Sequence, residues 1–138
     1  EPRGEFVGVH LRYGDNYFGR QISISRYSEL VDSLECKNKY VATDSSEALA
    51  HFQNLYPEMS AQTGALSLDM SRPGTSAAWF LVRNEKEKWV LSVAREVLVD
   101  ILVLSKAKFL IGLSVSKITT LAKLIGNARG NIQQVFEF

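Results

Sequence analysis

Several features that often identify a protein class are scarce or missing in this chain of 138 residues. Cysteine occurs once, at Cys36, which excludes an intrachain disulfide and a cysteine zinc site. The formal net charge is only +1, without the basic excess of a general nucleic-acid binder, so no nucleic-acid partner is expected. Residues 97–104 form an apolar run, but it is too short for a bilayer and Asp100 interrupts it. We therefore expect no membrane segment in this chain.

The sequence motifs of common nucleotide and hydrolytic sites are also missing. There is no Gly-x-x-x-x-Gly-Lys-Ser/Thr loop, no Gly-x-Gly-x-x-Gly turn and no Gly-x-Ser-x-Gly elbow. The two histidines, His10 and His51, fall in different predicted elements, and no Asp-x-Asp pair accompanies them. These absences argue against phosphate-loop, dinucleotide and serine-hydrolase sites and against a dedicated metal site. We expect His51 at the surface of a polar helix.

The size and the composition predict one compact domain over residues 1–138. Hydrophobic residues make up 46% of the chain, enough for a core, and the length leaves no room for a second domain. The sequence starts without methionine, only a few residues ahead of a predicted core strand, so we interpret it as one lobe of a longer protein. A single cysteine and the lack of Asn-x-Ser/Thr acceptors favour the cytosol over secretion.

Hydrophobic periodicity predicts strands that alternate with helices along the chain. We expect strands near residues 7–11, 39–43, 107–112 and 132–136, with a less regular one at 65–68 inside a loop-rich stretch. Helices are expected near residues 26–36, 46–55, 85–104 and 117–125. Ser25 should cap the first helix, Asp44 or Ser45 the second, and Gly126-Asn127 should close the last. This alternation predicts an α/β fold, a Rossmann-like and mostly parallel sheet with flanking helices.

Polar side chains follow three of the predicted strands, where the carboxyl edges of a parallel sheet would meet. His10, Arg12 and Asp15 follow the first strand, Asp44 follows the second, and the turn at residues 112–116 follows a later one. Because ligands of α/β sheets bind outside these strand ends, we expect an anion site there. The planar guanidinium of Arg12 and the amides that open the last helix suit a diphosphate. Alternatively, Arg12 and Asp15 pair only with each other at a turn, and His10 is a satisfied strand-end residue.

Two carboxylates at these edges each admit two interpretations. Asp44 could accept hydrogen bonds from ribose hydroxyls, or it could be only the cap of the helix that follows. Asp100 lies on the apolar side of its predicted helix, where a buried carboxylate needs a hydrogen-bond donor. It could accept two N–H bonds from a guanine edge, or it could turn to solvent at the margin of the apolar stripe, which the helix pattern alone favours.

Three motifs, in this order, resemble the donor-binding half of GDP-fucose-dependent fucosyltransferases, in particular the α1,6 (NodZ-like) group. They cover most of the chain: His10-Leu11-Arg12-x-Gly14-Asp15, then Thr43-Asp44, then the run from Asp100 through Gly112 to Ser116 and Ala122. The resemblance implies one lobe of a GT-B-like fold and an enzyme that transfers fucose from GDP-fucose to a glycan acceptor with inversion. It implies no obligatory metal and no other cofactor.

The resemblance also assigns roles to individual residues. It makes Arg12 the group that holds the β-phosphate and stabilises the departing GDP, where charge develops in the transition state. His10 and Asp100 match positions that contact guanine, Asp44 matches the acidic residue after the second strand, and Ser116 matches a phosphate-contacting serine. Tyr13 and Gly14 belong to the same binding loop. Asp15 is a candidate catalytic residue, or it does no more than fix the turn.

This chain departs from the family pattern in three places. Tyr13 stands where many members carry a second arginine, and Val115 stands where a serine is usual, with Ser114 as the substitute. The acceptor-binding lobe that precedes the donor lobe in the family is not in this sequence, so the isolated chain is expected to lack transfer activity. The resemblance is compatible with the bacterial cytoplasm or with a eukaryotic Golgi or ER lumen.

Two other functional classes stay open at this point. The chain could be a non-catalytic module that binds GDP or a nucleotide sugar, which the missing lobe and Tyr13 favour. It could also be an α/β domain used for protein contact, with Trp79 and Phe80 as an anchor. The three ordered motifs favour the glycosyltransferase.

Overall fold

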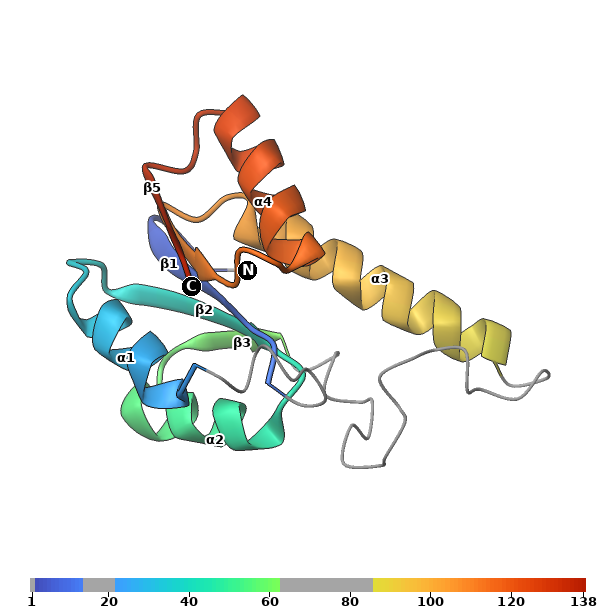
Figure 1. Cartoon of the computed structure of the whole chain (residues 1–138), viewed down its shortest axis with the longest axis horizontal. Helices are drawn as coiled ribbons and strands as arrows, with labels where there is room; N and C mark the ends of the chain where they lie inside the picture. Colours follow the sequence, from blue (N-terminus) through green and yellow to red (C-terminus); the bar gives the residue numbers. More distant parts are fainter. Residues whose placement is uncertain (1, 14–21, 63–85) are drawn as a thin grey trace.

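The computed structural model describes residues 2–13, 22–62 and 86–138 of the chain (Figure 1). The strands are β1 (Phe6–Leu11), β2 (Asn38–Thr43), β3 (Ser60–Gln62), β4 (Phe109–Gly112) and β5 (Gln134–Glu137). The helices are α1 (Ile24–Asp32), α2 (Ser46–Leu55), α3 (Lys86–Leu104) and α4 (Lys117–Ala128). The predicted strand at 65–68, the first residue of the helix predicted at 85–104, and the Trp79-Phe80 pair lie outside the described residues.

The described strands form a five-stranded sheet in the order β3-β2-β1-β4-β5, and every pair in it is parallel. β1 lies at the centre, with Val9 level with Val41 of β2 and with Ile111 of β4. The chain moves outward in one direction through β2 and β3, and then in the other through β4 and β5. This is a Rossmann-like arrangement, and it confirms the α/β fold predicted from the sequence.

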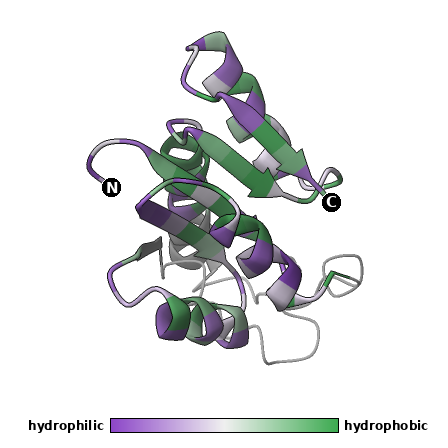
Figure 2. Ribbon diagram, turned by 90° about the vertical axis from the view of Figure 1, so that its left-hand side faces the viewer, coloured by the Kyte–Doolittle hydropathy of each residue, from purple (hydrophilic) through white to green (hydrophobic). Residues whose placement is uncertain are grey.

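Two helices cover each face of this sheet (Figure 1). On one face, buried residues of β1 and β2 pack with Tyr27 and Val31 of α1 and Phe52 of α2. On the other face, Tyr40 and Leu110 pack with Leu104 at the end of α3 and with Ala122 of α4. Figure 2 shows the consequence, with hydrophobic strands between helices that carry hydrophilic residues on their outer sides. Side chains alternate along β1, so Val7 and Val9 face α1 and α2 while Gly8 and His10 face α3 and α4.

Glycines in β1 and β4 let α3 and α4 approach the sheet closely. A Cβ on Gly8 would lie 2.9 Å from Ala107 Cβ and 3.0 Å from Leu104 Cδ2. A Cβ on Gly112 would overlap the side chain of Thr119, in the first turn of α4. The bare backbone at these two positions therefore sets the distance between the sheet and the two helices that flank the candidate site.

Several predicted boundaries were wrong. α1 is capped by Ser23, not by Ser25, because the Ser23 side chain accepts from the Arg26 amide, and the helix ends at Asp32 rather than at Cys36. α4 runs past Gly126-Asn127 to Ala128. Gly126 does not close α4, because it is buried in the helix where a Cβ would collide with Ile132 and the Ser105 carbonyl. The short strand β3 lies in a stretch that the sequence marks only as loop-rich.

Candidate functional site

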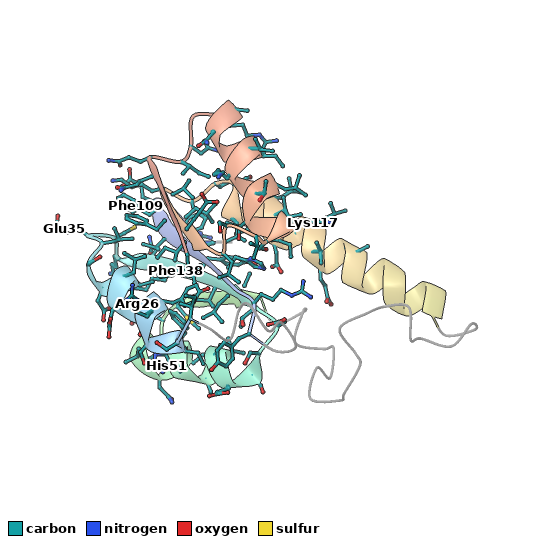
Figure 3. The ribbon with its side chains drawn as sticks, in the orientation of Figure 1. Arg26, Glu35, His51, Phe109, Lys117 and Phe138 are labelled. Atoms are coloured by element: carbon teal, nitrogen blue, oxygen red, sulfur yellow. The ribbon has the colours of Figure 1, made fainter. Side chains whose placement is uncertain are left out.

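The candidate site lies where the sheet changes direction, at the carboxyl ends of β1 and β4. β2 and β4 flank β1 on opposite sides, so the connections after β1 and β4 leave the sheet toward opposite faces. Such a switch point opens a crevice between two loops, and ligands of open α/β sheets bind in it. Residues 10–13 and 112–116 follow the ends of β1 and β4, and Lys117, labelled in Figure 3, marks the amino end of α4.

His10 joins β1 to the first turn of α4 through its Nδ1 atom. This nitrogen lies 3.0 Å from Thr119 Oγ1 and 3.2 Å from Ser116 Oγ, and all three residues are buried. Ser116 is the N-cap of α4, and its hydroxyl also accepts from the Thr119 amide. Both hydrogen bonds engage Nδ1, so Nε2 is the ring nitrogen left for a ligand. The alternative interpretation, that His10 is a strand-end residue whose hydrogen bonds are satisfied within the protein, therefore holds for Nδ1.

The environment of His10 keeps its imidazole neutral. Burial, together with the positive charge of Arg12, lowers the pKa of His10 to about 4. A neutral ring offers one N–H donor and one acceptor nitrogen, which suits hydrogen bonding to a polar ligand edge. The charge that an anion would meet in this crevice therefore comes from Arg12 and from the first-turn amides of α4, not from His10.

Arg12 and Asp44 meet across the ends of β1 and β2. Arg12 Nε lies 3.8 Å from Asp44 Oδ2, and Asp44 Oδ1 accepts from the Tyr13 amide at 2.7 Å. The Arg12 side chain is 39% exposed, and an ion pair of this length and exposure contributes little to stability. Asp44 is not the cap of α2, as the alternative interpretation had it, because the side chain of Ser45 accepts from the Ala48 amide.

Asp100 is buried, and not at the solvent-facing margin that the helix pattern alone favours. Its side chain is 3% exposed, and its Oδ1 accepts from the Tyr40 hydroxyl at 2.9 Å. Tyr40 comes from β2, on the face covered by α3 and α4. Burial, assisted by the nearby charge of Glu96 and opposed by the Tyr40 hydrogen bond, raises the pKa of Asp100 to about 6. At neutral pH the carboxylate is therefore ionised, although it is held inside the protein.

The register of sheet and helix places Asp100 on the same side of the molecule as His10. α3 leads back to the start of β4, so it runs opposite to the strands, and its Leu104 lies beside Gly8. Asp100 lies one helical turn before Leu104, about 6 Å nearer the carboxyl edge. His10 lies two residues beyond Gly8, about 7 Å nearer the same edge. The two residues are therefore at about the same level on one face of the sheet.

The remaining predicted site residues do not all join this arrangement. Ser114 is exposed, and both its amide and its hydroxyl donate to the Phe138 carbonyl, which anchors the chain after β5. Val115 beside it is 66% exposed. Gly14 and Asp15 lie outside the described residues. His51, expected at the surface, is half-buried, and its Nε2 lies 3.1 Å from Ser28 Oγ between α1 and α2.

Sequence reasoning missed two residues of this site. Thr119 lies in the first turn of α4, where a threonine gives no functional signal by itself. It follows the Ser116 cap by three positions, so both side chains lie on the helix face that contacts His10. Tyr40 looks like an ordinary core aromatic of a strand, and the signal that could have found it is Asp100, a carboxylate that needs a donor. Among residues 2–13, 22–62 and 86–138, no group of three or more metal-ligating side chains is found. Within the same ranges no helix has both the length and the apolar character of a membrane span.

The strand order and the polar groups at the switch point define a Rossmann-like α/β domain with a candidate anion-binding crevice. No family model and no curated protein matches the sequence, whereas solved structures do. The chain is similar to NodZ alpha-1,6-fucosyltransferase co-crystallized with GDP, with a TM-score of 0.62, 17% identity, and coverage of 97% of this chain and 38% of that one. For NodZ soaked with GDP-fucose the TM-score is 0.58 and the identity 18%, at the same coverage.

POFUT1 in complex with GDP gives a TM-score of 0.51 at 15% identity, over 96% of this chain and 41% of that one. These similarities confirm, at the level of the fold, the resemblance to fucosyltransferases drawn from the three sequence motifs. The chain spans about 38% of the length of the NodZ structures.

Proposed function

We propose that residues 1–138 form the donor-binding lobe of a glycosyltransferase, which binds GDP-fucose and supports inverting transfer of fucose to a glycan acceptor. The observation that carries the proposal is the fold shared with NodZ over 97% of the chain. The pairs His10–Ser116 and Arg12–Asp44 at the strand ends support it. The solved NodZ structures were obtained with GDP and with GDP-fucose. An acceptor-binding lobe, supplied by a further part of the protein, would complete the enzyme.

In this proposal the crevice separates the recognition of the base from that of the diphosphate. The buried carboxylate of Asp100 accepts N–H groups of guanine, and the neutral His10 ring adds one hydrogen bond through Nε2. Arg12 and the amino end of α4, where the helix dipole favours negative charge, receive the diphosphate. Asp44, already oriented by the Tyr13 amide, accepts from a ribose hydroxyl.

Arg12 carries the chemical contribution of this lobe. When the bond between fucose and the β-phosphate oxygen breaks, negative charge grows on the departing GDP, and a guanidinium beside that oxygen lowers the barrier. Removing one hydrogen-bond donor that stabilises such charge typically costs about two to three orders of magnitude in rate. The reaction needs no metal in this arrangement, since the cationic groups are supplied by the chain. The catalytic base in this proposal is Asp15 or a group on the acceptor side.

A second candidate function is a module that holds GDP or a nucleotide sugar without chemistry. It is favoured by Tyr13, which contributes a backbone amide to Asp44 where the family resemblance leads one to expect a second arginine. Both functions share the nucleotide site, and only the glycosyltransferase requires the fucosyl group to be transferred.

The first test is a calorimetric titration of the chain with GDP and with ADP in the presence of EDTA. The proposal predicts that GDP binds at least about tenfold more tightly than ADP, because ADP lacks the N–H groups that Asp100 accepts. Retention of this selectivity in EDTA supports a site that uses no metal. Equal affinity for the two nucleotides, or no binding of either, would overturn the proposed donor site.

A further inference from the structure

The hydrogen bond between Tyr40 and Asp100 ties the candidate base-binding carboxylate to the sheet. Tyr40 is 3% exposed and lies on β2, level with Gly8 of β1. Its ring packs edge-on against Phe6 at 6.4 Å, which fixes the direction in which the hydroxyl points. Asp100 comes from α3, so the bond of 2.9 Å joins two different elements. The position of the carboxylate is thus set from the sheet and not by its own helix alone.

The Tyr40 hydroxyl is always the donor of this hydrogen bond, because the Asp100 carboxylate carries no proton at neutral pH. Burial and the charge of Asp100 raise the pKa of Tyr40 far above its usual value, so the phenol stays protonated and always donates. Oδ1 accepts this hydrogen bond at 2.9 Å and keeps a second lone pair, so both oxygens of the carboxylate retain acceptor capacity for a ligand. A carboxylate held at one oxygen has a defined plane, and two parallel hydrogen bonds from a planar N–H edge require such a plane.

We propose that Tyr40 is a positioning residue for base selectivity, whose hydroxyl holds the Asp100 carboxylate in the plane that a guanine edge requires. The inference rests on the proposed function and goes beyond it, since Tyr40 itself touches no ligand. Without the hydroxyl the carboxylate swings about its side-chain bonds, keeps its charge, and loses its fixed orientation. The preference for a guanine nucleotide then falls although the phosphate contacts at Arg12 are intact.

The test compares two tyrosine variants that lose the same atom. Tyr40→Phe removes the hydroxyl that donates to Asp100. Tyr27→Phe is the matched control, because Tyr27 is equally buried on the other face of the sheet and its hydroxyl has no hydrogen-bond partner among the described residues. GDP and ADP affinities are measured by calorimetry for the wild-type chain and for both variants, with thermal unfolding as the check on folding.

We expect Tyr40→Phe to lower the ratio of GDP to ADP affinity about tenfold, with ADP affinity nearly unchanged, and Tyr27→Phe to leave the ratio at the wild-type value. A Tyr40→Phe variant that keeps the wild-type ratio overturns the inference and leaves the proposed function standing. A wild-type chain without selectivity for GDP overturns both. Equal losses of GDP and ADP affinity in Tyr40→Phe would indicate a merely structural role, and would also overturn the inference.

A double-mutant comparison gives an independent readout of the positioning role. Asp100→Asn retains an oxygen for the Tyr40 hydroxyl but replaces the acceptor Oδ2 by an amide donor. In that background, the added Tyr40→Phe change is expected to leave the GDP to ADP ratio unaltered, because the carboxylate it would position is gone. A further loss of several-fold in the ratio of the double variant would contradict the positioning role.

Discussion

At the scale of single residues, Asp44 and Asp100 show that the partner decides what a carboxylate does. Asp44 directly precedes a helix and has the side chain of a good N-cap, but Ser45 takes the cap and frees Asp44 to accept from the Tyr13 amide. Asp100 lies among apolar residues of α3, where a turn toward solvent was the simpler expectation, and Tyr40 makes burial possible. Both partners are distant in sequence, so no local pattern could reveal them.

Arg12 carries the prediction that separates diphosphate binding from general nucleotide binding. Arg12→Ala is expected to weaken GDP about 10- to 100-fold while GMP changes severalfold at most, because only GDP has the β-phosphate that the guanidinium would hold. Calorimetry with the two nucleotides checks this. Arg129→Ala, an exposed arginine at the C-cap of α4, serves as the charge-matched control. Equal losses for GDP and GMP would remove the β-phosphate from the role of Arg12.

At the scale of elements, the sequence predicts the centres of helices and strands better than their ends. The apolar stripe of α1 and the apolar runs of β1 and β2 reflect burial, which the periodicity of the sequence encodes. Ends depend on competition between neighbouring groups, as where Ser23 and Ser25 are both suitable caps and only Ser23 accepts from the Arg26 amide. β3 has three residues, too few for a periodic signal, and exists because β2 offers it an edge.

The packing of α3 on β1 yields a prediction about how closely a helix must approach. Gly8→Ala adds a methyl group that would lie 2.9 Å from Ala107 Cβ, so the end of α3 must shift, at a cost of about 1–3 kcal/mol in the free energy of unfolding. Urea denaturation measures the loss. Since α3 also carries Asp100, the selectivity for GDP over ADP should fall in the same variant.

A second substitution identifies the cause of that loss. Ala107→Gly removes the atom nearest to the added methyl group, and in combination with Gly8→Ala it should recover part of the stability and of the selectivity. An effect of Gly8→Ala that Ala107→Gly leaves unchanged would show that backbone flexibility in β1, and not the distance to α3, governs the position.

At the scale of the whole molecule, two buried groups affect stability in opposite directions as the pH changes. The pKa of His10 is lowered to about 4 from 6.5, so the unfolded chain takes up a proton first and stability is lost as the pH falls from about 6.5 to 4. The pKa of Asp100 is raised to about 6 from 3.8, so stability is lost as the pH rises through that range. The folded domain thus carries the cost of an ionised Asp100 at neutral pH.

Asp100→Asn is expected to remove this cost. The variant should be more stable than the wild type by about 2–3 kcal/mol at pH 8, and the difference should shrink to nearly zero below pH 4, where Asp100 is protonated in both the folded and the unfolded chain. Urea unfolding at pH 4, 6 and 8 measures it, with Glu29→Gln on the exposed side of α1 as the control. A difference that does not vary with pH would show that the ionisation of Asp100 is not responsible.

The central place of β1 in the sheet has a consequence for how the protein is made. Val7 pairs with Phe109, which follows it by about a hundred positions, and β2 is the only neighbour of β1 that is synthesised early. At about 5–20 residues per second, the β4-facing edge of β1 stays unpaired for roughly 5–20 s on the ribosome. An open strand edge invites pairing with other chains, so the nascent protein needs shielding during that interval. Gly8 and His10, which face α3 and α4, make that face of β1 less apolar than the face that carries Val7 and Val9.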